Sequence, residues 1–354
     1  MHVSLLAPVV ALFLISISMS AVAAEPPTAD DLLKSFEGSV EKLNRLQIEW
    51  KQALPRGEIQ TTVFRDGPRW KNDRWFLQQG TSPFAEGSRR EQTVISDEIL
   101  KISLQYNSAT DPPLLMPIIT AIRDKVSSRT WLQIGQPAIL FGRIPGDAGY
   151  PLWTIMRESG SLKLLETERI GDRDTYVLES QNKYGHHKLW LDPAAGSLPR
   201  RIEVRKRAGN LLNDEQLGTT TIPKPSAEAD PKPLVQLQSR RPHKASWLRI
   251  DNIQIENLNG AFTITGFEQQ GRITFVGEPE DENDGQPKPV NKMELRFRVD
   301  IDPRTFPDDA FKFAVAIPNG TMVFVADKSP LEFQGPARPE HEWIDGQVRE
   351  RSQK

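Results

Sequence analysis

Apolar residues recur at helical spacing near the start of the chain. After a proline-rich stretch, Thr28 stands where a helix N-cap is expected, and Asp30 and Asp31 follow in the first turn, where carboxylates favour the positive end of the helix dipole. The apolar positions that follow at helical spacing are Leu32, Leu33, Phe36, Val40, Leu43 and Leu46. They predict one amphipathic helix of about five turns.

From residue 48 onward the apolar period changes to two, which is typical of half-buried strands. Strands are expected over residues 48–54, 59–65, 70–77, 138–144, 162–169, 175–180, 187–192, 200–206, 247–256, 262–267, 271–276, 293–301 and 322–326, with a further pair inside residues 93–106. A second, short helix is expected over residues 113–128, where Leu115, Ile118, Ile119 and Ile122 dominate.

The clearest strand is residues 293–301, in which apolar side chains alternate strictly with Glu294, Arg296, Arg298 and Asp300. Such alternation indicates a strand with one wet face, as in antiparallel sheets. The pattern as a whole predicts an α+β fold that is mostly β, with one large antiparallel sheet and two helices.

Two adjacent histidines, His186 and His187, raise the question of a metal site in residues 184–204. Neighbouring residues of a strand point to opposite faces, so the two imidazoles are poorly placed to chelate one ion. The "DPAAGSLP" segment has proline and glycine where turns favour them. We interpret the stretch as a β-hairpin, and no metal site is expected.

The first 24 residues resemble a secretory signal peptide, with an apolar run over residues 5–17 followed by small residues. They carry no Lys or Arg, so an uncleaved membrane anchor remains an alternative. No later segment is long and apolar enough to span a bilayer. We expect export to the periplasm or the outside, one domain over residues 25–335, surface insertions at 209–245 and 277–291, and a polar tail over 336–354, where "EHEWIDG" is a candidate short strand.

The composition excludes several kinds of chemistry. There is no cysteine, and therefore no disulfide or Cys-based zinc site, and the formal net charge of −2 gives no reason to expect nucleic acid. Ser39 and Lys42 match a Ser-x-x-Lys spacing without the companion motifs of acyl-serine enzymes. Residues 280–285 mimic the start of a calcium loop but lack its final carboxylate. We expect no catalytic residues, cofactor or metal.

The order of these features is similar to that of the bacterial periplasmic lipoprotein-carrier superfamily, the LolA/LolB-like proteins. The resembling segments are "DDLLKSFEGSVEKLNRLQIEWKQ", "VFRDGPRWKNDRWF", "TVISDEILKISLQY", "LLMPIITAIRD", "YVLESQNKYGHHKLWLDPAAGSLPRRIEV" and "FKFAVAIPNGTMVFVAD". They extend over about 300 residues in the same order. This chain is longer than the simple carriers, chiefly through the two insertions.

The resemblance implies a strongly curved, unclosed antiparallel half-barrel with helices as a lid on an apolar concave face. Such proteins hold the acyl chains of lipoproteins or lipids, and the expected role here is non-catalytic, with a lipid or lipid-modified protein as ligand and an inner- or outer-membrane protein as a candidate partner. Carried over to this sequence, the cavity wall consists of Trp50, Phe64, Trp70, Leu100, Ile102, Leu104 and Tyr106, and the lid helix of Leu115, Ile118 and Ile119. The family's basic residue falls on Arg65 or Arg69.

Three functions therefore stay open. The first is a monomeric carrier or sensor of lipids or lipid-modified proteins. The second is an envelope interaction or stress-sensing module of the same fold, whose apolar faces pack into a dry core. The third is a secreted glycan hydrolase that works through a carboxylate pair.

Overall fold

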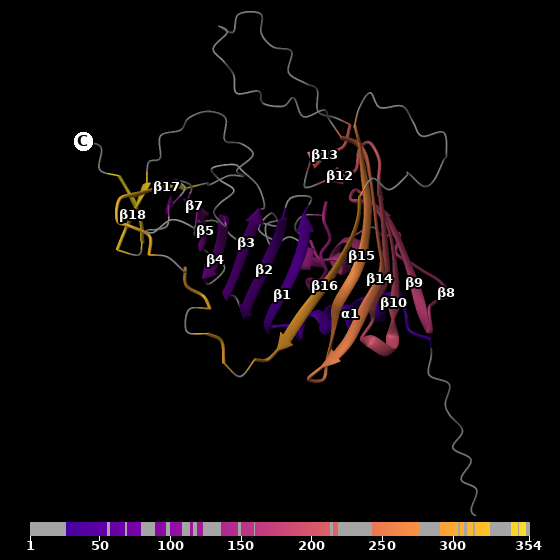
Figure 1. Ribbon diagram of the computed structural model, residues 1–354. Coiled ribbons are helices and arrows are strands. Elements are labelled where there is room, and N and C mark those ends of the chain that lie inside the picture. Colours follow the sequence, from indigo (N-terminus) through magenta and orange to yellow (C-terminus); the bar gives the residue numbers. More distant parts are fainter. Residues whose placement is uncertain are drawn as a thin grey trace, which may run out of the picture.

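The described residues form one large, open antiparallel sheet with two α-helices packed against it (Figure 1). The computed structural model describes residues 26–54, 57–67, 69–78, 89–96, 100–107, 114–115, 119–122, 136–147, 150–158, 160–212, 215–218, 243–275, 291–303, 305–307, 310–313, 316–325, 341–345 and 347–351. The mostly β class is confirmed. The segment expected to be a signal peptide, residues 219–242 and residues 276–290 lie outside the described residues.

The sheet contains 17 strands within the described residues. The first group is β1 (Arg45–Leu54), β2 (Gly57–Asp66), β3 (Arg69–Gln78), β4 (Arg89–Ser96), β5 (Leu100–Asn107), β6 (Leu114–Leu115) and β7 (Ile119–Ile122). The second group is β8 (Lys163–Ile170), β9 (Arg173–Asn182), β10 (Gly185–Asp192), β11 (Leu198–Lys206), β14 (His243–Leu258), β15 (Ala261–Phe275) and β16 (Asn291–Ile301). The last strands are β17 (Thr321–Val325), β18 (His341–Ile344) and β19 (Gln347–Glu350), while β12 (Leu211–Leu212) and β13 (Glu215–Gln216) form a separate hairpin.

The pairings give one continuous order from β8 to β19. It runs β8, β9, β10, β11, β14, β15, β16, β1, β2, β3, β4, β5, β7, β17, β18, β19, with β6 also paired to β5. Within the described strands only β7 and β17 are parallel, and no pairing joins β8 to β19. The sheet is therefore not closed into a barrel. The β1–β16 pairing joins the first group of strands to the second.

The first helix, α1 (Ala29–Glu41), begins where the sequence predicts it. The Thr28 hydroxyl accepts a hydrogen bond from the Asp31 amide, and the Asp31 carboxylate accepts one from the Thr28 amide, which is a capping box. The helix is shorter than expected because Arg45 already pairs with Asp66 in the sheet. Leu46 is buried, but it belongs to β1 and not to the helix. The helical spacing of apolar residues therefore continued by chance into the first strand.

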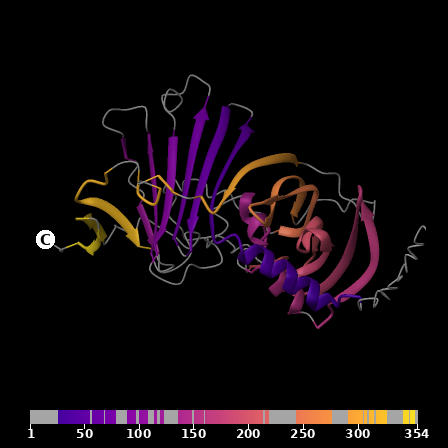
Figure 2. The same ribbon diagram turned by 90° about the horizontal axis from the view of Figure 1, so that it is seen from below.

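The core lies between the two helices and one face of the sheet, which we call the inner face and define by Ile48, Trp50, Leu189 and Ile202. Helix α1 contacts α3 (Leu152–Arg157) and β15, and Figure 2 shows it lying along the second group of strands. The side chains that fill this space are fully buried; they include Leu33, Phe36, Leu140, Leu152 and Ile155. The Phe36 and Trp153 rings meet edge to face with centroids 5.2 Å apart.

The strand expected over residues 138–144 is wrong. This segment forms the 3-10 helix η1 (Gln136–Phe141), which is followed by Gly142 at φ +64°. Ala138, Ile139, Leu140 and Phe141 are all buried. An apolar run without alternation does not distinguish a strand from a buried helical turn, and Pro137 near its start favours the turn.

The helix expected over residues 113–128 is wrong for the part that the structure describes. Leu115 lies in β6 and Ile119 in β7, both paired with β5, while Ile118 lies outside the described residues. The β-branched side chains of Ile118, Ile119 and Ile122 suit a strand, and Pro117 interrupts a helix. Leu115 and Ile119 are therefore not part of a lid helix.

Most other expected strands are confirmed within a few residues. The two strands expected over 262–267 and 271–276 form the single strand β15, paired with β14 along most of its length. Strand β16 buries Leu295, Phe297 and Ile301 and exposes the alternate charged residues, as predicted. The segment "EHEWIDG" contributes β18, which pairs with β19. Within the described residues, no helix has the length and apolar character to cross a membrane.

Candidate functional site

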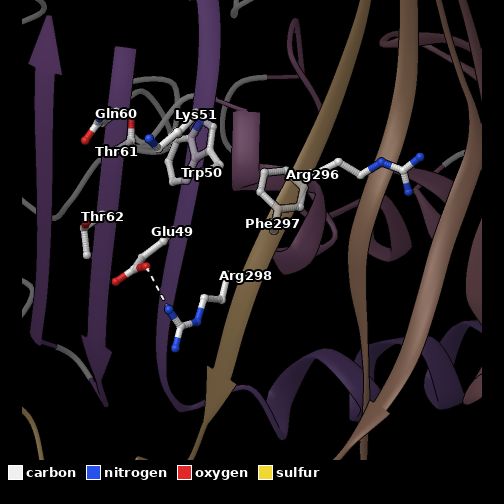
Figure 3. Close-up of a pocket in the computed structure, with 9 residues that line it drawn as sticks. All are labelled: Glu49, Trp50, Lys51, Gln60, Thr61, Thr62, Arg296, Phe297 and Arg298. Atoms are coloured by element: carbon white, nitrogen blue, oxygen red, sulfur yellow. Dashed lines mark ion pairs between the residues drawn. The ribbon is translucent and has the colours of Figure 1, made fainter. Parts of the chain in front are cut away.

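A pocket of about 510 Å³ opens in the sheet where β1 and β16 separate (Figure 3). The two strands are in register from the Leu46–Ile301 pair to the Trp50–Phe297 pair, and their pairing ends there. Beyond this point both strands continue, β1 to Leu54 and β16 back to Asn291. The pocket therefore lies at the junction between the two groups of strands.

The floor of the pocket is aromatic. Trp50 of β1 and Phe297 of β16 face each other across the gap between the strands, and their ring centroids are 5.9 Å apart at an interplanar angle of 80° (Figure 3). Phe267 of β15 continues the cluster, with its centroid 5.6 Å from that of Phe297. Trp50 and Phe297 are each 6% exposed, so the two rings close the pocket toward the inner face.

The sides of the pocket are charged. Glu49, Lys51, Arg296 and Arg298 line it together with Gln60, Thr61 and Thr62 of β2. Arg298 lies 3.9 Å from the Glu49 carboxylate, but its side chain is 86% exposed. An ion pair this exposed to water is worth at most about 1 kcal/mol. The guanidinium can therefore exchange Glu49 for a ligand anion at little cost.

Three of the seven expected wall residues have side chains that the structure describes, and of these three only Trp50 lines this pocket. Trp70 is buried on the inner face, where its ring lies 4.9 Å from that of Phe141. Phe64 is on the opposite face, because it is paired with Gln47 and Lys71, whereas Trp70 is paired with Arg65. The expectation that Phe64 shares a wall with Trp50 and Trp70 is wrong.

Phe64 has its own aromatic partners. Its ring packs edge to face on Phe306 and Phe311, at centroid distances of 6.1 and 6.5 Å. Phe306 and Phe311 belong to the chain that follows β16, so a later segment covers this part of the outer face. Phe64 is thus buried although it points away from the inner face.

The other four wall residues, Leu100, Ile102, Leu104 and Tyr106, lie on β5, and their side chains are outside the described part of the structure. The backbone register places Ile102 opposite Val94, and Val94 opposite Lys71. Trp70 is paired with Ile95, one residue further along, so Trp70 and Ile95 point to the opposite face from Val94 and Ile102. Their role in a cavity wall stays a prediction.

The two candidate basic residues occupy different environments. Arg65 lies on the inner face, donates a hydrogen bond to the Leu43 carbonyl at 2.8 Å, and stacks over Trp70 with 4.8 Å to the ring centroid. Burial, and then the positive charge of Arg65, lower the pKa of Arg143 to about 10. The positive charge of Arg65 therefore acts on a second, half-buried guanidinium group.

Arg69 is instead at the outer turn between β2 and β3. Its side chain forms an ion pair with Asp66 and is 53% exposed. The guanidinium also lies 4.8 Å from the centre of the Phe311 ring. Arg69 has the position of a surface residue, whereas Arg65 borders the core.

The histidine pair forms part of a hairpin, as predicted. His186 is half-buried and its Nε2 lies 2.8 Å from Glu179, whereas His187 is fully buried on the inner face. Among the described residues there is no group of three or more His, Asp or Glu side chains placed to hold a metal ion.

A buried polar cluster around His187 is absent from the predictions. His187 Nε2 lies 2.8 Å from Asp147 Oδ2, and the Lys206 ammonium forms an ion pair with the same carboxylate. The Lys206 Nζ also donates to the carbonyls of Tyr184 and Leu211, at 2.7 and 2.8 Å. Side-chain exposure in the cluster is 1% or less.

The sequence indicates one member of this cluster, Lys206, but not its partner Asp147. Lys206 ends an alternating strand on the apolar row of Ile202 and Val204, where a charged residue is unusual. Asp147 comes from the loop between η1 and α3, and no pattern in the sequence links it to the strand. The cluster joins this loop to the sheet, and its groups are buried and paired with one another, so we assign it a structural role.

Comparison with known proteins adds no assignment: no family model matches the chain, and neither does any curated protein.

Proposed function

We propose that this protein is an exported, non-catalytic binding protein that holds an acyl chain of a lipid or a lipid-modified protein. The observation that carries the proposal is the opening between β1 and β16, which combines an aromatic floor with charged sides. The similarity of the sequence to periplasmic lipoprotein carriers supports the same function. The open antiparallel sheet is consistent with it.

The chemistry of the pocket suits an amphipathic ligand. An apolar chain gains about 0.8 kcal/mol for each methylene group that it buries, so ten methylenes contribute about 8 kcal/mol before ordering costs. Small-molecule sites in proteins have volumes of about 300–1,000 Å³, a range that includes the pocket. Lys51, Arg296 and Arg298 line the pocket in exposed ion pairs with Glu58, Glu294 and Glu49, and they can exchange these partners for a negatively charged head group.

Trp50 and Phe297 can separate to admit a ligand at a small cost in free energy. The edge-to-face contact of Trp50 and Phe297 is worth about 0.5–1.5 kcal/mol beyond the burial of its area. The burial of two methylenes offsets that loss. We propose that the acyl chain enters between the two rings, toward Phe267.

The alternative is an interaction module with a dry core. The observation that favours it is the packing between α1, α3 and the inner face, where Leu33, Phe36 and Ile155 are completely buried. In this part of the fold the apolar strand faces are occupied by the protein's own side chains. An acyl chain therefore belongs at the β1–β16 opening or beside the first group of strands.

Mass spectrometry of an organic extract tests the proposal directly. The mature chain, residues 25–354, is purified from a periplasmic fraction without detergent. A stoichiometric fatty acid or phospholipid in the extract supports the carrier. An empty extract, together with no rise in melting temperature on adding palmitate or lysophosphatidylglycerol, contradicts it and favours the interaction module.

A double charge reversal tests the position of the site. Arg296→Glu with Arg298→Glu changes two side chains that are 60% and 86% exposed, so the fold is preserved. We expect several-fold weaker binding of lysophosphatidylglycerol, measured by tryptophan fluorescence. Arg173→Glu, at a half-exposed position on β9, is the matched control. Equal affinity of the double variant and the control would place the ligand elsewhere.

A further inference from the structure

A second, basic pocket lies on the outer face of the sheet, at the end of β11 and the adjoining ends of β14 and β15. It has a volume of about 160 Å³, and its lining contains three arginines, Arg205, Arg207 and Arg272, with Trp247 between them. Figure 1 shows this end of the strands next to the β12–β13 hairpin. None of the residues that line it is Asp or Glu.

The strand register explains why the arginines gather there. Arg205 is paired with Trp247, and Trp247 with Arg272, so the three side chains form one row across three adjacent strands. Neighbouring strands are about 4.8 Å apart, and paired residues point to the same face. Arg207 follows directly after the end of β11 and also lines the pocket. The two outer arginines of the row therefore flank the indole ring.

The carboxylates near Arg205 and Arg207 do not neutralise these two arginines. Arg205 reaches Glu203 only at 4.0 Å, and Glu203 has a closer partner in Arg249 at 3.2 Å. Arg207 is exposed and makes no ion pair with another described residue. Lys206 also lines the pocket, but its ammonium points inward to Asp147 and does not contribute a free charge.

Trp247 supplies an independent indication of a ligand. Its Nε1 atom is buried, yet it has no hydrogen-bond partner among the described residues. A buried donor without an acceptor costs free energy, and indole N–H groups in proteins usually find a partner. Trp247 lines the pocket, so an anion bound there would offer an acceptor to this donor once the indole turns its N–H out of its buried position.

We infer that this pocket binds a phosphoryl group, held by Arg205 and Arg207 with the Trp247 N–H and bordered by Arg272. Guanidinium groups match the geometry of phosphate oxygens and bind them through paired hydrogen bonds. The volume of about 160 Å³ is large enough for one phosphoryl group. The phosphoryl group is either free phosphate or part of an anionic lipid head group.

This inference is independent of the acyl-chain site. The two pockets share no residue, and Trp50 and Phe297 have no part in the second one. An empty lipid extract would therefore leave the phosphoryl site in place. Loss of phosphate binding would equally leave the β1–β16 pocket untouched.

The test uses the mature chain with two probes, inorganic phosphate in calorimetry and phosphatidylcholine vesicles with or without phosphatidic acid in a flotation assay. We expect Arg207→Gln to weaken binding about tenfold, since a hydrogen bond to a charged group contributes that much. Trp247→Phe keeps an aromatic side chain, removes the N–H, and is expected to weaken binding several-fold. Arg173→Gln, a half-exposed arginine on β9, is the control and should bind as the wild type does.

The outcomes separate the sources and decide the inference. Binding of phosphate alone identifies a free anion, and binding only to vesicles that contain phosphatidic acid identifies a lipid head group. No binding of either probe by the wild type overturns the site. An effect of Arg207→Gln without any effect of Trp247→Phe also overturns it, because the arginine would then act as general surface charge. Unchanged circular dichroism and melting temperature show that both variants are folded.

Discussion

Replacement of Lys206 by methionine removes the cation that neutralises a fully buried carboxylate. The methionine keeps the length and apolar character of the lysine stem, so the change acts mainly on the ammonium group. In the native protein this group pairs with Asp147 and donates to the carbonyls of Tyr184 and Leu211. The variant leaves the carboxylate with His187 as its remaining described partner.

The expected loss of stability is about 3–5 kcal/mol, the usual effect of breaking a buried ion pair on one side. The side-chain exposure of Lys206 and Asp147, 1% and 0%, shows that water cannot compensate for the missing charge. A second change, Asp147→Asn, removes the remaining charge and keeps an acceptor oxygen for His187 Nε2. We therefore expect the double variant to be more stable than Lys206→Met alone.

Guanidinium denaturation followed by tryptophan fluorescence gives the free energy of unfolding of the wild type, both single variants and the double variant. The control is Lys34→Met in the exposed ion pair with Asp30, where side-chain exposure is 66% and 48% and the loss should stay below about 1 kcal/mol. Additive effects of Lys206→Met and Asp147→Asn would refute the reasoning, because they would show that the two groups are not coupled.

Three further predictions concern the packing of Gly142 against Trp153, the N-cap of α1, and the stability of the fold at alkaline pH. Gly142→Ala places a Cβ 2.2 Å from the Trp153 ring at φ +64°, so we expect the melting temperature to fall by many degrees, and an unchanged value would contradict this packing. The hydrogen bonds from Thr28 lower the pKa of Asp31, so the cap stabilises the fold above the carboxyl's ordinary pKa and loses its effect as the pH falls through the lowered one. Asp31→Asn should therefore lower the melting temperature at neutral pH but not in strong acid, and an equal difference at both pH values would contradict it. Burial raises the pKa of Tyr184 to about 12, so the unfolded chain ionises first and stability falls as the pH rises from about 10 to 12. Tyr184→Phe should reduce that fall in alkaline denaturation curves, and curves of the same slope would show that another group is responsible.

The local elements could be predicted from the sequence because each depends on short-range patterns. The alternation in β16 determines which of its side chains are wet, and Thr28 with Asp31 determines where α1 begins. His186 and His187 are adjacent in a strand, so their imidazoles point to opposite faces of the sheet, and this conclusion needs no knowledge of the fold. These conclusions need only the geometry of one strand or one helical turn.

Other elements were misjudged where a pattern was ambiguous. The apolar run that forms η1 lacks alternation, and the run that includes Ile119 contains both a proline and β-branched residues. In both cases the choice between helix and strand depends on which neighbours the segment can pair with. The sequence does not contain that information locally.

The tertiary structure alone decided how the sheet is assembled and where its sites lie. The pairing of β1 with β16 joins segments about 250 residues apart, and its end at Trp50 and Phe297 creates the first pocket. The register across β11, β14 and β15 brings Arg205, Trp247 and Arg272 into one row. A strand's alternation shows that a residue lies on one of two faces, but the pairing with other strands determines which residues share that face and where it opens.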